Sequence, residues 1–232
     1  MFTHIAGRYE LFNHVATLGQ DFVWRPRALW ELDRFRTPGP VRRILDIGCG
    51  TGELAHLAAR HYPGASVVGA DFTRAMVAQA RATRRPANLA PRLDYGRATV
   101  LSLPFPDATF DLGMSAFVVR NLPKLPDAFR ELRRVLVPGG TLMTLEVAEP
   151  PSAMVRRVFH AYFDTVVPFL GGLAHSAGPY RYLPDSLRSL PSREGMMELL
   201  RSAGFDPVQA VTQSGGIVTT YLAQVPAPAR SG

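Results

Sequence analysis

The chain has 232 residues, of which 47% are hydrophobic and 19% charged, and its formal net charge is +7. This length fits one α/β domain, and the composition is that of an ordinary globular core and excludes a largely disordered chain. One cysteine excludes an internal disulfide, and six histidines without close pairing predict no metal site.

The positive charge comes almost entirely from arginine, since Lys124 is the only lysine. The arginines are spread from Arg8 to Arg230 without a dense basic run, so we expect no nucleic-acid partner. Contact with an anionic membrane surface stays open. Charged residues interrupt the N-terminal stretch, and no apolar run reaches eighteen residues. We therefore expect a cytoplasmic protein without a transmembrane helix, peripheral at the membrane at most.

The hydrophobic pattern predicts strands and helices that alternate along most of the chain. Residues 9–35 are expected to be helical, with interruptions near Gly19 and Pro26 and an end at the Pro-rich residues 37–40. Strands are expected at residues 41–47, 66–70, 93–101, 110–115 and 141–147. Helices are expected between them at residues 53–62, 73–83 (with Thr73 as the N-cap) and 125–136. This alternation predicts a parallel sheet with crossover helices.

The last third of the chain departs from that alternation. A long helix is expected over residues 151–170, followed by a loop-rich segment at 171–191 and a helix at 194–203. Residues 205–212 and 216–224 are expected to form a terminal strand pair, and residues 226–232 a frayed tail. The long helix carries an apolar stripe, which predicts core packing, with a groove for an apolar ligand as the alternative. The stripe consists of Val155, Val158, Phe159, Tyr162 and Phe163.

The most informative segment is the glycine loop at residues 46–52, with the sequence Asp-Ile-Gly-Cys-Gly-Thr-Gly, between the first strand and its helix. Glycines let the backbone approach a ligand closely, and the helix that follows presents free N–H groups and its dipole. Asp71 stands about twenty residues further on, at the end of the next strand, where a carboxylate suits a ribose diol. These features predict a nucleoside-cofactor site.

Two cofactors are compatible with this loop. Residues 50–55 fit the G-x-G-x-x-G/A pattern of dinucleotide-binding oxidoreductases. Residues 46–52, starting at Asp46, resemble instead the acidic-plus-GxGxG loop of S-adenosylmethionine (SAM) methyltransferases, in which the carboxylate receives the cofactor's ammonium. A pyrophosphate is repelled by a carboxylate at that place, so the loop favours SAM over NAD.

The order of strand, glycine loop, helix, strand-Asp and a later Pro-Gly-Gly hairpin resembles the class I SAM-dependent methyltransferases. Further segments over nearly the whole chain resemble one branch, the ubiquinone/menaquinone biosynthesis C-methyltransferases. These segments are residues 2–14, 67–76, 103–107, 120–122, 134–140, 180–186 and 215–218. The opening motif, the Arg120-Asn121 pair and the Tyr-Arg-Tyr-Leu-Pro segment at 180–184 are the most specific of them.

The resemblance implies an α/β, Rossmann-like fold with a seven-stranded, mostly parallel sheet, an antiparallel last strand and helices on both faces. It implies an N-terminal helical lid at residues 1–40 and a methyltransferase domain at 41–225, with an acceptor-binding insertion at about 150–190. The implied reaction is methyl transfer from SAM to a ring carbon of a demethylated prenyl quinol, demethylmenaquinol above others. Another aromatic or polyketide acceptor, a SAM-binding subunit without turnover and an NAD-dependent oxidoreductase remain as alternatives, and a homodimer stays open.

The same resemblance implies the site residues, and no metal is among its ligands. A quinol ring carbon becomes nucleophilic as the neighbouring hydroxyl loses its proton, so a cation or donor is needed beside that oxygen. Arg120 is expected in that role, with Asn121 as a second donor. The cofactor-binding residues are expected to be Asp46, Gly48, Gly50, Thr51, Gly52, Asp71, Phe72, Thr99, Val100 and Ala116. The acceptor is expected to contact Tyr9, Asn13, His14, Tyr180 and Tyr182.

The chain departs from the family pattern at two places near the site. Thr99 and Val100 stand where the family has an acidic residue or Asn followed by Ala, a pair that addresses the adenine. Val118 replaces the glycine that usually precedes the Arg-Asn pair, and we expect it to narrow the cleft. These departures leave SAM binding intact as a prediction and leave the identity of the acceptor open.

Overall fold

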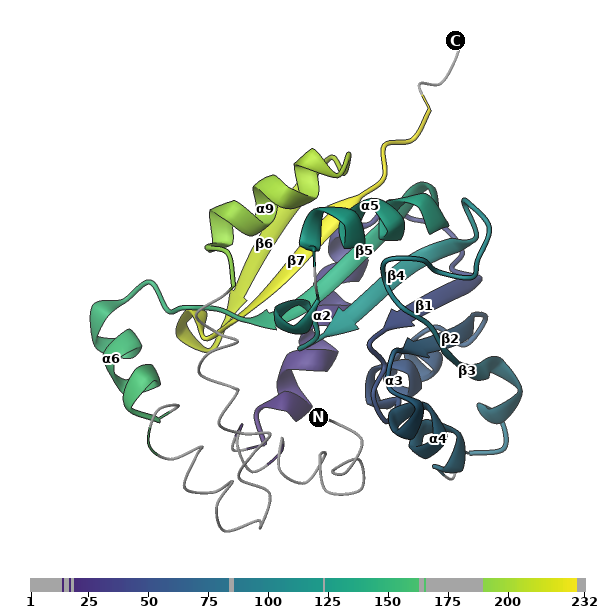
Figure 1. The fold of residues 1–232 in the computed structure, drawn as a ribbon, viewed down its shortest axis with the longest axis horizontal. Helices are drawn as coiled ribbons and strands as arrows, with labels where there is room; N and C mark the ends of the chain where they lie inside the picture. The colour runs from purple at the N-terminus through teal and green to yellow at the C-terminus, as the bar shows by residue number, and fades with distance from the viewer. Residues whose placement is uncertain are drawn as a thin grey trace.

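The computed structural model describes residues 14, 17, 19–83, 86–122, 124–162, 165 and 190–228, and these form a three-layer α/β structure (Figure 1). Its seven-stranded sheet has the order β3-β2-β1-β4-β5-β7-β6. The strands are β1 (Arg43–Ile47), β2 (Ser66–Asp71), β3 (Leu93–Arg97), β4 (Phe110–Ala116), β5 (Leu136–Val147), β6 (Val208–Gln213) and β7 (Val218–Gln224). The helices are α2 (Asp21–Phe35), α3 (Glu53–His61), α4 (Arg74–Ala82), α5 (Leu125–Val135), α6 (Ala153–Ala161) and α9 (Arg193–Ser202).

The first five strands are parallel to one another, and β7 is antiparallel to both β5 and β6. The predicted sheet, mostly parallel with an antiparallel last strand, is therefore confirmed. The chain order reverses direction in space between β1 and β4, and ligands of open α/β sheets bind at the carboxyl end of the strands beside such a switch point.

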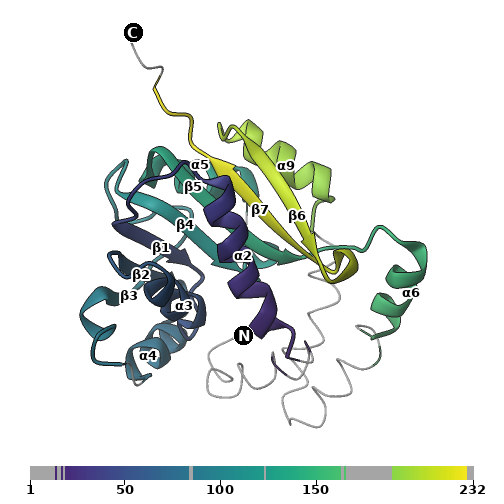
Figure 2. The ribbon, with the colours of Figure 1, turned by 180° about the vertical axis from the view of Figure 1, so that it is seen from behind.

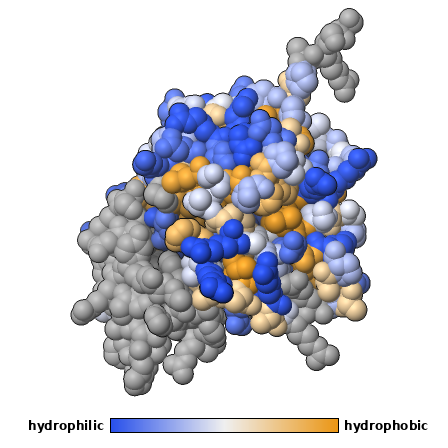
Figure 3. Space-filling view, turned by 45° about the vertical axis from the view of Figure 1, so that its right-hand side comes forward, coloured by the Kyte–Doolittle hydropathy of each residue, from blue (hydrophilic) through white to orange (hydrophobic). Residues whose placement is uncertain are grey.

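Helices cover both faces of the sheet, as predicted. On one face α2, α3 and α4 bury small and aliphatic residues such as Ala28, Leu29 and Ala58 against the strands. On the other face α5 and α9 pack together, and α5 turns Ala128, Phe129 and its later apolar residues inward at helical spacing. Figure 2 shows α2 lying outside the strands when the molecule is seen from behind. On the face drawn in Figure 3, hydrophilic and hydrophobic residues are interspersed.

The predicted interruption of the N-terminal helix at Pro26 is wrong. The helix α2 runs through Pro26 to Phe35. Proline has φ values suited to a helix, and the hydrogen bond that it removes belongs to the carbonyl of exposed Phe22, which water can reach. Gly19, with φ +72°, does break the chain before α2 begins.

Two strand boundaries also differ from the prediction. β3 ends at Arg97 instead of residue 101, because Thr99 pairs with Ser102 in an isolated bridge and the chain turns there. β5 begins at Leu136 instead of residue 141. Gly139 N–H donates to the Val225 carbonyl at 2.9 Å and Val225 N–H donates to the Gly140 carbonyl at 2.8 Å, so the Pro-Gly-Gly segment stays attached to the sheet.

The helix expected over 151–170 is described from Ala153 to Ala161, as α6, and residues 163, 164 and 166–170 lie outside the described part. The predicted apolar stripe on it is partly confirmed. Phe159 is buried as expected, whereas Val158 is 66% exposed and does not pack in the core. Within the described residues, no helix is both long and apolar enough to span a bilayer.

Candidate functional site

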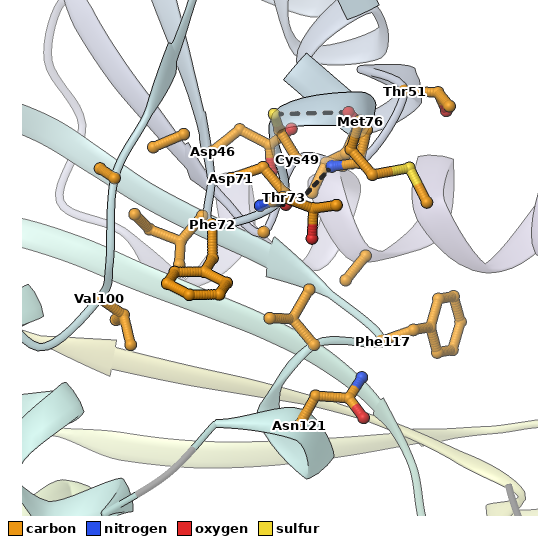
Figure 4. A pocket seen from close by; sticks show the side chains of 18 of the residues that line it. Asp46, Cys49, Thr51, Asp71, Phe72, Thr73, Met76, Val100, Phe117 and Asn121 are labelled. Atoms are coloured by element: carbon orange, nitrogen blue, oxygen red, sulfur yellow. Dashed lines mark hydrogen bonds between the residues drawn. The ribbon is translucent and has the colours of Figure 1, made fainter. Parts of the chain in front are cut away.

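A cavity of about 390 Å³ opens at the carboxyl ends of β1, β2 and β4, a size suited to a small molecule (Figure 4). Its walls come from the glycine loop, the end of β2, the segment after β3 and the segment between β4 and the short helix η3 (Val119–Asn121). The predicted residues that line it are Asp46, Gly48, Gly50, Thr51, Asp71, Phe72, Thr99, Val100, Ala116 and Asn121.

The three glycines of the loop all have positive φ but differ in what surrounds their Cα atoms. A Cβ on Gly48 (φ +64°) would lie 2.5 Å from both methyls of Val118. A Cβ on Gly52 (φ +93°) would lie 2.5 Å from the hydroxyl oxygen of Tyr95, so Gly52 packs against the protein and does not line the cavity. A Cβ on Gly50 (φ +53°) would meet nothing within 4 Å. The backbone at Gly50 therefore faces open space, where a ligand can approach it.

Asp71 ties the end of β2 to this loop. Its Oδ2 accepts a hydrogen bond from Gly50 N–H at 3.0 Å, and its Oδ1 accepts one from Thr73 N–H at 2.7 Å. A carboxylate has about four acceptor sites, so two remain for a ligand with adjacent hydroxyl groups. Asp71 thus both shapes the loop and presents acceptors to the cavity.

Asp46 lies deeper, at the base of the cavity, and its side chain is 1% exposed. Burial raises the pKa of Asp46 to about 8, against the lowering effects of a hydrogen bond from the backbone of Ala55 and the charge of Arg25. Its Oδ2 has no hydrogen-bond partner among the described residues. An unpaired buried carboxyl oxygen is costly, so this position suits a ligand that brings its own cationic donor.

Apolar side chains flank the cavity at both ends. Figure 4 shows Phe72 and Val100 at one end and Phe117 at the other. Phe72 is largely exposed, and the guanidinium of Arg97 lies 5.4 Å from the centre of its ring. Phe72 and Val100 offer apolar surface to a flat aromatic ring, while Thr99 supplies a hydroxyl nearby.

Charged residues on α2 and α3 close the other side of the cavity. Arg25 of α2 donates to Asp21 Oδ2 at 2.9 Å and contacts Glu53 Oε2 of α3 at 2.9 Å. His14 Nδ1 lies 2.6 Å from the same Asp21 oxygen, and its Nε2 lies 3.3 Å from Glu53 Oε1. Burial alone would raise the pKa of Asp21, but the hydrogen bonds from Thr17 and Arg25 and the charge of Arg25 outweigh it and lower that pKa.

These ion pairs were not predicted. Arg25, Glu53 and Phe117 line the cavity without having been singled out from the sequence. The one local signal was the i,i+4 spacing of Asp21 and Arg25 in a helical segment. His14, expected to contact the acceptor, is held in this network instead of in the cavity wall. Tyr9, Asn13, Tyr180 and Tyr182 lie outside the described residues.

Arg120 and its neighbour Asn121 have different surroundings. Asn121 lines the cavity, whereas Arg120 is absent from the described residues that line it. The guanidinium of Arg120 forms an ion pair with buried Glu146 of β5, whose Oε2 also accepts from Arg120 N–H at 3.2 Å. The guanidinium also lies 5.8 Å from the centre of the Phe117 ring. Glu146 therefore holds the Arg120 guanidinium, and Arg120 is not among the described residues of the cavity wall.

Comparison with known proteins identifies the family. The ubiE/COQ5 methyltransferase family matches residues 1–224. The chain belongs to this family. It is 43% identical over 206 residues to a protein of Thermus thermophilus named demethylmenaquinone methyltransferase, covering 88% of this chain and 91% of that one. It is 37% identical over 225 residues to the ubiquinone/menaquinone biosynthesis C-methyltransferase UbiE of Geobacter sulfurreducens, covering 97% of this chain and 86% of the relative.

Solved structures agree on the fold. A SAM-dependent methyltransferase of Aquifex aeolicus has a TM-score of 0.61 at 19% identity, over 87% of this chain and 89% of that one. The [4+2]-cyclase SpnF has a TM-score of 0.63 at 22% identity, over 88% of this chain and 81% of that one. Since one neighbour is named as a cyclase, the fold alone does not define the reaction.

Family membership makes the protein a SAM-dependent methyltransferase, which replaces the dinucleotide oxidoreductase and the inactive subunit as interpretations. The cavity fits this cofactor. The unpaired Asp46 oxygen would accept from the ammonium of SAM, and the free acceptor sites of Asp71 would take the ribose hydroxyls. Phe72 and Val100 would flank the adenine, and Gly50 leaves room for the cofactor beside the loop.

Proposed function

We propose that the enzyme methylates a ring carbon of a demethylated prenyl naphthoquinol of the demethylmenaquinol type. The observation that carries this proposal is the 43% identity, over most of both chains, to the Thermus thermophilus protein named for that reaction. A Deinococcus radiodurans relative of the same name is 39% identical over 206 residues.

The activated methyl group is supplied by the sulfonium of SAM, so the protein's tasks are alignment, exclusion of water and stabilisation of the charge that develops on the acceptor. The acceptor carbon gains nucleophilicity as the adjacent hydroxyl loses its proton. Asn121 lines the cavity and is our donor for that oxygen. The apolar surfaces of Phe117 and Val118 on the same wall keep water from the reacting atoms.

Arg120 contributes without lining the described cavity. Its ion pair with Glu146 fixes η3 against β5, which holds Asn121 in place one residue further on. We assign Asn121 the direct contact and Arg120 the positioning of Asn121 through its ion pair with Glu146.

A benzoquinol is the alternative acceptor, because other relatives are named for ubiquinone as well as menaquinone biosynthesis. The test is methyl transfer from methyl-labelled SAM to a naphthoquinol and a benzoquinol that carry the same short prenyl tail. The proposal expects the naphthoquinol to have the higher kcat/KM, by about tenfold or more. A preference for the benzoquinol, or transfer to neither, refutes it.

The role of Asn121 is tested by Asn121→Ala, with Asn88→Ala as the matched control on an exposed surface away from the cavity. Removing a donor that stabilises a developing oxyanion costs about 100-fold or more in kcat. We expect that loss for Asn121→Ala with the affinity for S-adenosylhomocysteine retained, and no loss for Asn88→Ala. An unchanged kcat removes Asn121 from the mechanism.

A further inference from the structure

The helix α2 exposes large apolar side chains on the side that faces away from the sheet. Phe22 is 65% exposed, Val23 62% and Trp30 52%. Two arginines share that side, Arg27 and Arg34, and the guanidinium of Arg34 lies 4.6 Å from the centre of the Trp30 ring. We call these residues the outer face of α2, which comprises Phe22, Val23, Pro26, Arg27, Trp30 and Arg34.

The outer face is not needed to attach α2 to the protein. The opposite side of the helix buries Trp24, Ala28, Leu29 and Leu32 in the core. Trp24 Nε1 also donates to Ser214 Oγ at 2.8 Å. Folding buries the apolar groups of the outer face only in part, Phe22 through a stack on His14 with 4.3 Å between the ring centres. A contiguous apolar patch on a protein surface marks a contact with another phase or partner.

The chemistry of the outer face favours a lipid surface. Tryptophan and phenylalanine prefer the interface between headgroups and acyl chains, and arginine binds phosphate with its planar fork. The three acidic residues of α2 are buried or paired. Asp21 is buried beside Arg25, and Asp33 accepts from Arg36 and from Tyr62. Glu31 lies 3.9 Å from the Arg27 guanidinium, whose side chain is still 54% exposed. The chain's net charge of +7 adds a general attraction to anionic lipid.

We propose that the outer face of α2 docks on an anionic phospholipid bilayer, with Phe22, Val23 and Trp30 at the headgroup level and Arg27 and Arg34 on lipid phosphates. The functional meaning rests on the proposed prenyl quinol acceptor, which dissolves in bilayers. Arg25 on the inner side of the same helix lines the cofactor cavity, so docking through α2 holds that cavity close to the phase that contains the acceptor.

The sequence provides a direct readout, since it has two tryptophans and only Trp30 is exposed, Trp24 being 5% exposed. The experiment titrates the full chain, without acceptor, with vesicles of phosphatidylglycerol and phosphatidylcholine or of phosphatidylcholine alone. We expect a blue shift of tryptophan emission with the anionic vesicles only, reduced by added salt. Trp30→Phe should abolish the shift.

A charge-matched pair of variants locates the contact. Arg27→Glu/Arg34→Glu changes the outer face, whereas Arg130→Glu/Arg201→Glu makes the same change of net charge on α5 and α9, across the sheet. Each arginine near an anionic surface contributes about a factor of five, so the first pair should weaken vesicle binding by about 30-fold or more. The second pair should weaken it much less.

Three results overturn the proposal. The first is the absence of an emission shift with anionic vesicles, and the second is an equal loss of vesicle binding in the two double variants. The third is a dimer without lipid that Trp30→Ala dissociates, since a second copy of the chain would then cover the outer face. Methyl transfer to a short-tailed, water-soluble quinol without vesicles is measured in parallel. Arg27→Glu/Arg34→Glu should retain that activity. Its absence in the unaltered enzyme would refute the acceptor, whereas absence of vesicle binding alone would refute the docking.

Discussion

Gly48→Ala tests whether the glycine loop and Val118 are matched to each other. The substitution places a side chain at φ +64°, which costs about 1–2 kcal/mol for an L-residue. It also places a methyl 2.5 Å from both methyls of Val118, an overpacking that costs about 1–3 kcal/mol. We therefore expect the free energy of unfolding to fall by about 2–5 kcal/mol.

Gly50→Ala is the matched control, because Gly50 also has positive φ (+53°) but a Cβ there meets nothing within 4 Å. It should show only the backbone cost of about 1–2 kcal/mol. Urea unfolding of Gly48→Ala, Val118→Ala and the double variant then isolates the contact. Val118→Ala should recover the overpacking part in the double variant, giving a coupling free energy of about 1–3 kcal/mol.

The reasoning is refuted if Gly48→Ala is no more destabilising than Gly50→Ala, or if the two substitutions at Gly48 and Val118 are additive within about 0.5 kcal/mol. Either result would mean that the loop moves away from Val118 at little cost. In that case the side chain of Val118 would not require glycine at position 48.

Three further predictions follow from the polar groups of the site. Asp71→Ala should weaken S-adenosylhomocysteine binding by about 1–3 kcal/mol in calorimetry, since it removes acceptors for the ribose and for Gly50 N–H; unchanged affinity would contradict this role. Asp46 has a pKa of about 8 in the folded protein against 3.8 as reference, so the native state holds an extra proton between about pH 4 and 8. The free energy of unfolding of the cofactor-free protein should therefore fall as the pH rises through that window. In urea unfolding at pH 5, 7 and 9, Asp46→Asn should show a smaller fall than the unaltered protein. The same fall in both proteins would disprove this role of Asp46. Glu146→Leu should lower the free energy of unfolding in urea by about 3–5 kcal/mol, because it leaves Arg120 without its buried partner. The double variant Glu146→Leu/Arg120→Met should regain most of that stability. No recovery in the double variant would contradict the importance of the ion pair.

The local features of the fold and site were readable from the sequence. The glycine loop and Asp71 were placed correctly because short-range chemistry dictates them: positive φ at Gly48, Gly50 and Gly52 needs glycine, and a strand must end before a helix can begin. The alternation of strands and helices likewise follows from hydrophobic periodicity. The strand ends at Arg97 and Leu136 were missed, because pairing with distant segments such as Val225 decides where a strand starts or stops.

The sequence by itself determined the parallel sheet, the cofactor loop and the family of the enzyme, since each is written in short motifs or in the spacing of apolar residues. Only the tertiary structure decided what the charged side chains do. Arg120 was expected beside the acceptor from its place in a motif, but only the structure shows that Glu146, which is 26 residues away in the chain, pairs with its guanidinium. Arg25 lines the cavity while Arg27 on the same helix faces outward. Ion pairs between residues far apart in the chain depend on which elements come together in the fold, and the local sequence pattern does not contain that information.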